Sequence, residues 1–157
     1  MKLRTILGSL VVFCAVVAIS FAADAATANL GTRKLNEAKS KFSPGAQKNH
    51  TVVYAMEGDM WVVTVDGVDK DGKAAHNVWK GKFDGKDYPV TGDPAFDARS
   101  YKKVDANTLD MTVKKGGKVV GTGKIVVSAD GKSRTVTTKG ADPAVTAFNN
   151  TAVYDKQ

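Results

Sequence analysis

The chain has 157 residues, of which 43% are hydrophobic and 25% are charged. This length suits one domain with a sizeable core, and the composition excludes a chain too polar to fold. The formal net charge of +7 is spread without long runs of like charge, so it indicates a solvated surface. We therefore expect no specific nucleic-acid partner.

The first 22 residues have the pattern of a secretory signal peptide. Basic residues precede the uncharged apolar run Thr5–Ala22, and small residues follow it. We expect cleavage after Ala22, which removes the only cysteine, Cys14, and leaves no disulfide and no membrane span. An uncleaved membrane anchor is the alternative. The predicted location is secreted or periplasmic, with residues 23–29 as a flexible leader.

Residues 30–157 have the pattern of a single all-β domain. Short runs rich in Val and Thr alternate with turns, and only Asn36–Phe42 could form a short helix. Asp-Gly pairs beginning at Asp66, Asp71, Asp84 and Asp130 predict tight turns, because glycine readily takes a positive φ. The predicted strands include 51–57, 60–66, 76–83, 86–91 and 148–156, with four more between 97 and 140.

About nine or ten strands joined by short connections predict an antiparallel up-and-down meander. Such a meander leaves exposed edges unless it closes, so we expect a lipocalin-like barrel, or otherwise a two-sheet sandwich. The final stretch "TAVYDKQ" is expected to pair with the first strand and close the sheet.

Alternation along the strands places aromatic and polar side chains together on the inner face. Arg134, Asn150 and Tyr154 are costly in a dry core but suit a cavity that holds water or a ligand head group. Val119, Gly121, Gly123, Ile125 and Val127 are expected on one face, with the glycines in a structural role. Core packing is the alternative for each aromatic residue. The candidate ligand-binding residues are Tyr54, Trp61, Trp79, Phe83, Arg134, Asn150 and Tyr154.

The order of these segments resembles that of calycin barrels, the lipocalins and intracellular fatty-acid-binding proteins. "LGTRKLNEAKSKF" is similar to their opening strand, "TVVYAMEGDMWVVTVDG" to their second and third, and the segment ending in "TAVYDK" to their closing meander. The chain also resembles small exported bacterial lipocalin-like proteins. The resemblance implies a barrel with an internal ligand and places Tyr154 beside the ligand's head group.

The chain departs from the calycin pattern at informative positions. Arg33 stands where the family has tryptophan, and Ala152 stands where the fatty-acid-binding proteins have the arginine that holds a carboxylate. The segment that forms their helical lid is short here. Arg134 has inward parity and is a candidate for a displaced anion anchor, whereas Lys124 has outward parity.

No catalytic or cofactor-binding pattern is present in the sequence. His50 and His76 lie on different elements without other ligands at metal spacing, so strand-end histidines are favoured over haem or metal ligands. The segment "GTGKIV" lacks the glycines and the following helix of a phosphate-binding loop. We expect a protein that is not an enzyme and has no cofactor.

Two functions remain after these exclusions. The first is a monomeric binding protein that holds a small hydrophobic or amphipathic molecule inside the barrel. The second is a structural or protein-interaction module with a filled core and recognition on its outer surface. A binder of single-stranded nucleic acid or glycan is a weaker third. A sizeable internal cavity would favour the first.

Overall fold

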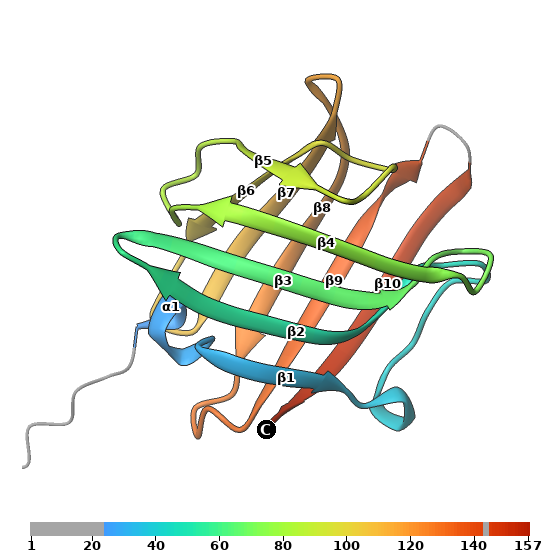
Figure 1. Ribbon diagram of the computed structural model, residues 1–157. Helices are drawn as coiled ribbons and strands as arrows, with labels where there is room; N and C mark the ends of the chain where they lie inside the picture. The colour runs from blue at the N-terminus through green and yellow to red at the C-terminus, as the bar shows by residue number, and fades with distance from the viewer. Residues whose placement is uncertain (1–23, 143–144) are drawn as a thin grey trace, which may run out of the picture.

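The computed structural model describes residues 24–142 and 145–157, which form ten antiparallel strands closed into one barrel (Figure 1). The predicted signal segment, residues 1–22, lies outside the described residues. The helical elements are α1 (Ala25–Ala28) and a 3-10 helix, η1 (Glu37–Lys39). The strands are β1 (Gly31–Leu35), β2 (Lys48–Glu57), β3 (Met60–Val68), β4 (Ala74–Gly81), β5 (Tyr88–Thr91), β6 (Ala98–Lys103), β7 (Thr108–Lys115), β8 (Lys118–Val127), β9 (Ser133–Asp142) and β10 (Val145–Lys156).

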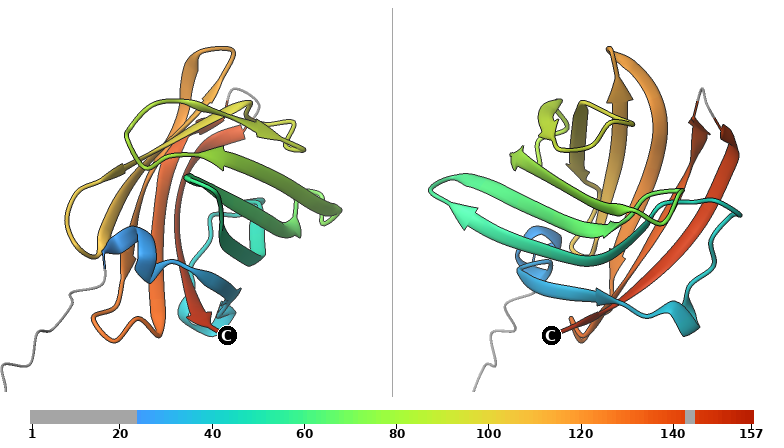
Figure 2. Two further views of the ribbon diagram at one scale, coloured as in Figure 1. Left: turned by 60° about the vertical axis from the view of Figure 1, so that its left-hand side comes forward. Right: turned by 45° about the vertical axis from the view of Figure 1, so that its right-hand side comes forward.

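The predicted up-and-down order and closure are confirmed. Each strand pairs with the next along the chain, and β10 pairs with β1, where Leu35 lies opposite Tyr154. Strands β1–β4 cross in front of β7–β10, so the barrel is flattened into two layers that face each other (Figures 1 and 2). The last segment is therefore a closing strand, as expected. None of the helices in the described part of the chain is long and apolar enough to cross a membrane.

The predicted Asp-Gly turns are confirmed at three of four positions. Gly72, Gly85 and Gly131 have φ of 77°, 82° and 70°, a region that other residues rarely occupy. The prediction was wrong at Gly67, which lies within β3. There the β2–β3 register shifts, and a Cβ on Gly67 would lie 2.0 Å from the Lys48 carbonyl oxygen. This glycine permits a close backbone approach instead of a turn.

The barrel wall has its shortest ladders on either side of β5. This four-residue strand makes two residue pairs with β4, Val78–Thr91 and Trp79–Val90. It makes two more with β6, Tyr88–Arg99 and Pro89–Ala98. Pro89 has no N–H to donate, which limits the ladder that β5 can form.

Helix α1 closes one end of the barrel, where the sequence predicted a flexible leader. The Asp24 side chain caps the helix by accepting from the Ala26 N–H at 3.2 Å, and it forms an ion pair with Lys103 at the end of β6. Ala25 and Ala26 are buried, and α1 packs against β7 and β8 (Figure 2). Residues 24–29 therefore belong to the packed domain, because the small side chains fit the barrel end.

Candidate ligand-binding site

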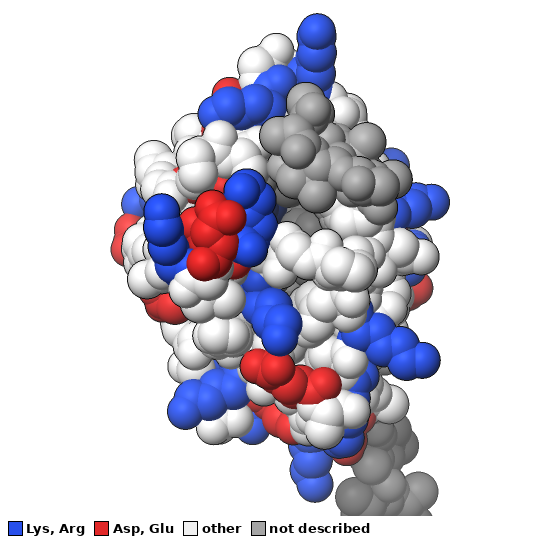
Figure 3. Space-filling model, turned by 90° about the vertical axis from the view of Figure 1, so that its right-hand side faces the viewer, with Lys and Arg blue, Asp and Glu red and all other residues white. Residues whose placement is uncertain are grey.

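A cavity of about 1150 Å³ lies inside the barrel. Its opening lies between residues 43–47, 69–71 and 92–96, at the end of the barrel opposite α1. Figure 3 faces this end, over which basic and acidic side chains are interspersed. The apolar wall includes Val52, Val63, Val65, Ile125, Val136 and Phe148.

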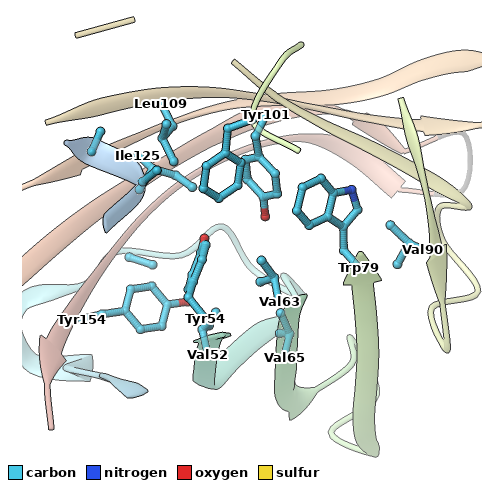
Figure 4. Packing of buried hydrophobic residues seen from close by; sticks show 14 residues of the cluster. Val52, Tyr54, Val63, Val65, Trp79, Val90, Tyr101, Leu109, Ile125 and Tyr154 are labelled. Atoms are coloured by element: carbon cyan, nitrogen blue, oxygen red, sulfur yellow. The ribbon is translucent and has the colours of Figure 1, made fainter. Parts of the chain in front are cut away.

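Three tyrosines from different strands supply polar groups to this apolar space. Tyr54 on β2, Tyr101 on β6 and Tyr154 on β10 are buried and line the cavity. Figure 4 shows the Tyr54 and Tyr101 rings with their hydroxyls turned toward each other across the interior. Burial raises the pKa of Tyr154 to about 12, although the positive charge of Arg134 opposes the shift. Burial also raises the pKa of Tyr101. The hydroxyls of Tyr101 and Tyr154 are therefore neutral hydrogen-bonding groups at ordinary pH.

Arg134, at the start of β9, points into the cavity between two of these tyrosines. Its Cζ lies 4.9 Å from the centre of the Tyr54 ring and 4.7 Å from that of Tyr154. Its Nη1 donates to the Asn29 Oδ1 at 3.2 Å, and its Nε has no partner. Cation–π contacts and one amide thus hold a guanidinium that is 2% exposed. The predicted inward direction of Arg134 is confirmed.

Arg33 on β1 lies near Arg134 at the closed end but does not line the cavity. The side chain is fully buried, and its Nη2 donates to the carbonyl oxygens of Ala28 at 2.6 Å and Gly131 at 3.2 Å. Burial, together with repulsion by Arg134, lowers the pKa of Arg33. Its Nε and Nη1 have no hydrogen-bond partner. Two guanidiniums therefore share one end of the barrel.

Arg99 on β6 is the third buried arginine and also lines the cavity. It donates to the Tyr101 hydroxyl and to the Asn77 Oδ1, each at 3.2 Å. The Asn77 amide in turn donates to Asp93 at 3.3 Å, near the opening. Arg99 is thus connected to a carboxylate through one intervening side chain, and its guanidinium packs 5.0 Å from the Phe96 ring centre.

Asn150 lines the cavity, but its acceptor is already used. Its Oδ1 accepts from the Ser43 backbone N–H at 2.8 Å, and this bond fixes the segment beside the opening to β10. The same segment contains η1, a single turn in place of the longer helix considered for Asn36–Phe42. The geometry therefore assigns Asn150 a role in holding the β1–β2 connection.

The remaining predicted residues form an aromatic cluster outside the cavity wall. Phe83 stacks on Trp61 at 4.9 Å and on Trp79 at 5.8 Å between ring centres. The Trp79 Nε1 donates to the Arg99 carbonyl oxygen at 2.8 Å, which satisfies its polar group within the core. These three side chains point inward as predicted, but their contacts are those of core packing. The structure thus brings Tyr54, Arg134, Asn150 and Tyr154 together and leaves the other three apart.

Sequence reasoning missed Arg33, Arg99 and their inward direction. Both positions carried a signal, because Arg99 shares its face of β6 with Tyr101, and Arg33 lies between Gly31 and Leu35 on one face of β1. The prediction that Lys124 points outward is confirmed: its Nζ lies 2.8 Å from the Asp110 Oδ1 on the exposed surface.

Both histidines are exposed, and His76 lies at the edge of the cavity. His76 Nδ1 lies 2.6 Å from Asp66 Oδ1 on the exposed surface between β3 and β4, and His50 is also exposed. Within residues 24–142 and 145–157, no group of three or more His, Cys, Asp or Glu side chains is arranged to hold a metal ion.

Comparison with known proteins relates the chain to others through its fold. No protein-family model matches the chain, and no curated protein matches its sequence. The barrel is similar to the redesigned β-barrel mFAP1 bound to DFHBI, with a TM-score of 0.50, 14% identity and coverage of 85% of this chain and 100% of that chain. It is also similar to EF1p2_mFAP2b bound to DFHBI, with a TM-score of 0.48, 14% identity and coverage of 85% and 97%. At this identity the likeness to mFAP1 supports a shared barrel fold.

Proposed function

We propose that this protein binds a small hydrophobic or amphipathic molecule inside its barrel and does so without catalysis. The observation that carries the proposal is the cavity of about 1150 Å³, whose inner wall combines apolar side chains with buried polar ones, and whose opening adds the charged residues Asp69, Lys70, Asp71 and Asp93. Binding sites for small molecules have this composition, and their volumes run to about 1,000 Å³, so this cavity is large enough for such a ligand. The barrel mFAP1, bound to DFHBI, is one example of a similar fold with an occupant.

The alternative was a module with a filled core and recognition on the outer surface. A cavity of this volume counts against a filled core. The large hydrophobic side chains that are exposed in the described residues are Met56, Val104, Val119 and Val126, which are spread over β2, β8 and a loop. Scattered side chains of this kind are ordinary on a surface. The observations therefore favour internal binding.

We further propose that the protein works as a monomer outside the cytoplasm, secreted or periplasmic. The support for export is the apolar run and the small residues that follow it in the first 25 positions of the sequence. A calycin-type carrier of apolar molecules would fit that location, because such molecules need a protein to cross aqueous compartments.

The test of internal binding is a matched pair of tryptophan substitutions, read with the uncharged dye Nile red as probe. Val136→Trp adds bulk to the cavity wall, whereas Val126→Trp adds the same bulk to the exposed face of the neighbouring strand. We expect the dye to bind the wild type, to bind V136W several-fold more weakly and to bind V126W like the wild type. Equal binding to the two variants, or none to the wild type, would contradict the proposal.

Native mass spectrometry of protein purified from its own host provides the second measurement. The expected result is a mass above that of the chain, with a small molecule recovered by solvent extraction. An empty chain under every growth condition would favour the surface-recognition alternative.

A further inference from the structure

The interior of the barrel carries positive charge that the described residues do not balance. All three arginines in the described part of the chain, Arg33, Arg99 and Arg134, are buried, at 0%, 5% and 2% exposure. No Asp or Glu among residues 24–140 and 148–157 is buried, and none of the lysines there is buried either. Four guanidinium nitrogens have no hydrogen-bond partner. Unpaired charge inside a protein is costly, so its presence needs a compensating group.

The positive charge at the closed end of the cavity is less well compensated than that of Arg99. Arg99 already donates to Tyr101 and to Asn77, which is linked to Asp93. Arg134 has one side-chain acceptor, a neutral amide, and has the second cation Arg33 behind it. An anion beside Arg134 would be attracted by both guanidiniums, in an interior where water screens charge weakly.

Arg134 also has the geometry of a binding group. Its Nε is unpartnered and buried, and the guanidinium is held in place between the Tyr54 and Tyr154 rings. Because the two rings and Asn29 already restrain the side chain, little side-chain entropy remains to be lost when a ligand binds. A guanidinium pairs best with planar or tetrahedral oxyanions, through two parallel N–H donors.

We propose that the molecule held in the cavity is an anion, whose carboxylate, sulfate or phosphate group binds Arg134 at the closed end, with Arg33 adding attraction from behind. The apolar part of the molecule lies along Val52, Val63 and Ile125 toward the opening. This proposal rests on the proposed internal binding and specifies the chemical class of the ligand.

The test compares twelve-carbon probes that differ only in their head group, using protein unfolded, extracted with solvent and refolded to remove bound molecules. Isothermal titration calorimetry measures dodecanoate, dodecanol and dodecyltrimethylammonium, and inorganic phosphate serves as a free anion. We expect dodecanoate to bind at least about tenfold more tightly than dodecanol, the gain expected from a hydrogen bond to a charged group. Dodecyltrimethylammonium is expected to bind more weakly than either.

Two variants that each remove one positive charge test whether the preference for dodecanoate arises inside the cavity. Arg134→Met removes the buried cation, and Lys124→Met removes an exposed cation from the outer face of β8. We expect R134M to bind dodecanoate and dodecanol with equal affinity and K124M to keep the wild-type preference. Circular dichroism and thermal melting check folding of both, and the wild-type comparison of head groups stands without either variant.

The outcomes separate the two proposals. If dodecanol binds wild-type protein as tightly as dodecanoate, the anion assignment is overturned and internal binding stands. If neither binds, both are overturned. If phosphate alone binds as tightly as dodecanoate, or if R134M keeps the preference, the assignment of an amphipathic anion to Arg134 is overturned.

Discussion

Arg134, Tyr54 and Tyr154 come from three strands and meet at the closed end of the cavity. The two rings lie within 5 Å of the guanidinium carbon, and all three side chains are almost fully buried. Aromatic faces reduce the free-energy cost of burying a cation, but they do not neutralise its charge. At the scale of single residues, the site is therefore organised around the positive charge of Arg134. The proposed ligand would supply the negative charge that balances it.

The buried hydroxyl of Tyr154 predicts a loss of stability in alkali. In the unfolded chain this group ionises near pH 10, whereas burial holds its folded pKa at about 12. The folded state then keeps a proton that the unfolded state loses, so the stability present below about pH 10 falls as the pH rises toward 12.

Tyr154→Phe removes this contribution. The free energy of unfolding of Y154F should therefore fall less than that of the wild type between about pH 10 and about pH 12, by roughly 2 kcal/mol. Urea titrations of both proteins at several pH values measure the difference, and the comparison near neutral pH serves as the control. Parallel stability curves would contradict the prediction.

The inner face of most strands follows from alternation, but alternation fails where the ladder is irregular. Val119 was expected to share one face with Gly121, Gly123, Ile125 and Val127, yet it is 58% exposed whereas Ile125 and Val127 are buried. The β7–β8 register shifts between Val113 and Lys114, next to Val119, so the parity of β8 changes there. A single sequence gives no sign of such a shift.

The sequence also could not predict which inward-facing residues line the cavity and which belong to the packed core. Tyr54 and Trp79 both have inward parity, but only Tyr54 lines the cavity. Their difference depends on position along the barrel axis and on which rings meet across the interior. Arg33 was overlooked for a related reason. An arginine on a short first strand is ordinarily expected to be exposed, and only the structure shows that α1 covers it.

The glycines of β8 and β9 have the structural role that the sequence predicted for Gly121 and Gly123. Gly121 lies opposite Gly140, and a Cβ on Gly140 would lie 2.5 Å from the Val120 carbonyl oxygen. Backbone atoms limit the space there, so the neighbouring strand would have to shift to accommodate a side chain.

Gly140→Ala should therefore lower the free energy of unfolding by about 1–3 kcal/mol, the usual cost of overpacking. The neighbouring Lys139→Ala, on the exposed face of β9, should change it by less than about 0.5 kcal/mol. Chemical denaturation of both variants measures the contrast. An unchanged midpoint for G140A would contradict the close approach.

At the scale of the whole molecule, stability depends on closure. β10 pairs with β9 over most of its length and with β1 through Tyr154, Asp155 and Lys156. The domain has no disulfide to hold it if this strand is lost, because Cys14 is the only cysteine in the chain. Closure also removes exposed strand edges, which favour aggregation.

Deletion of residues 151–157 is expected to prevent folding or to produce aggregates, since it exposes the edges of β1 and β9. Deletion of Gln157 alone removes no strand residue and should leave the fold intact. Far-ultraviolet circular dichroism and size-exclusion chromatography distinguish these results. A soluble, folded and monomeric product of the longer deletion would contradict closure by β10.

The short ladders of β5 have a consequence for how the interior exchanges with solvent. Two residue pairs join β5 to each neighbour, fewer than join any other two neighbouring strands that the structure describes. Local opening follows the weakest cooperative unit of a protein. The amide protons of Tyr88, Val90 and Thr91 should therefore exchange faster than those of β2, β3 or β9. Parting of the wall at β5 would provide a route by which a large molecule reaches the interior without unfolding the barrel.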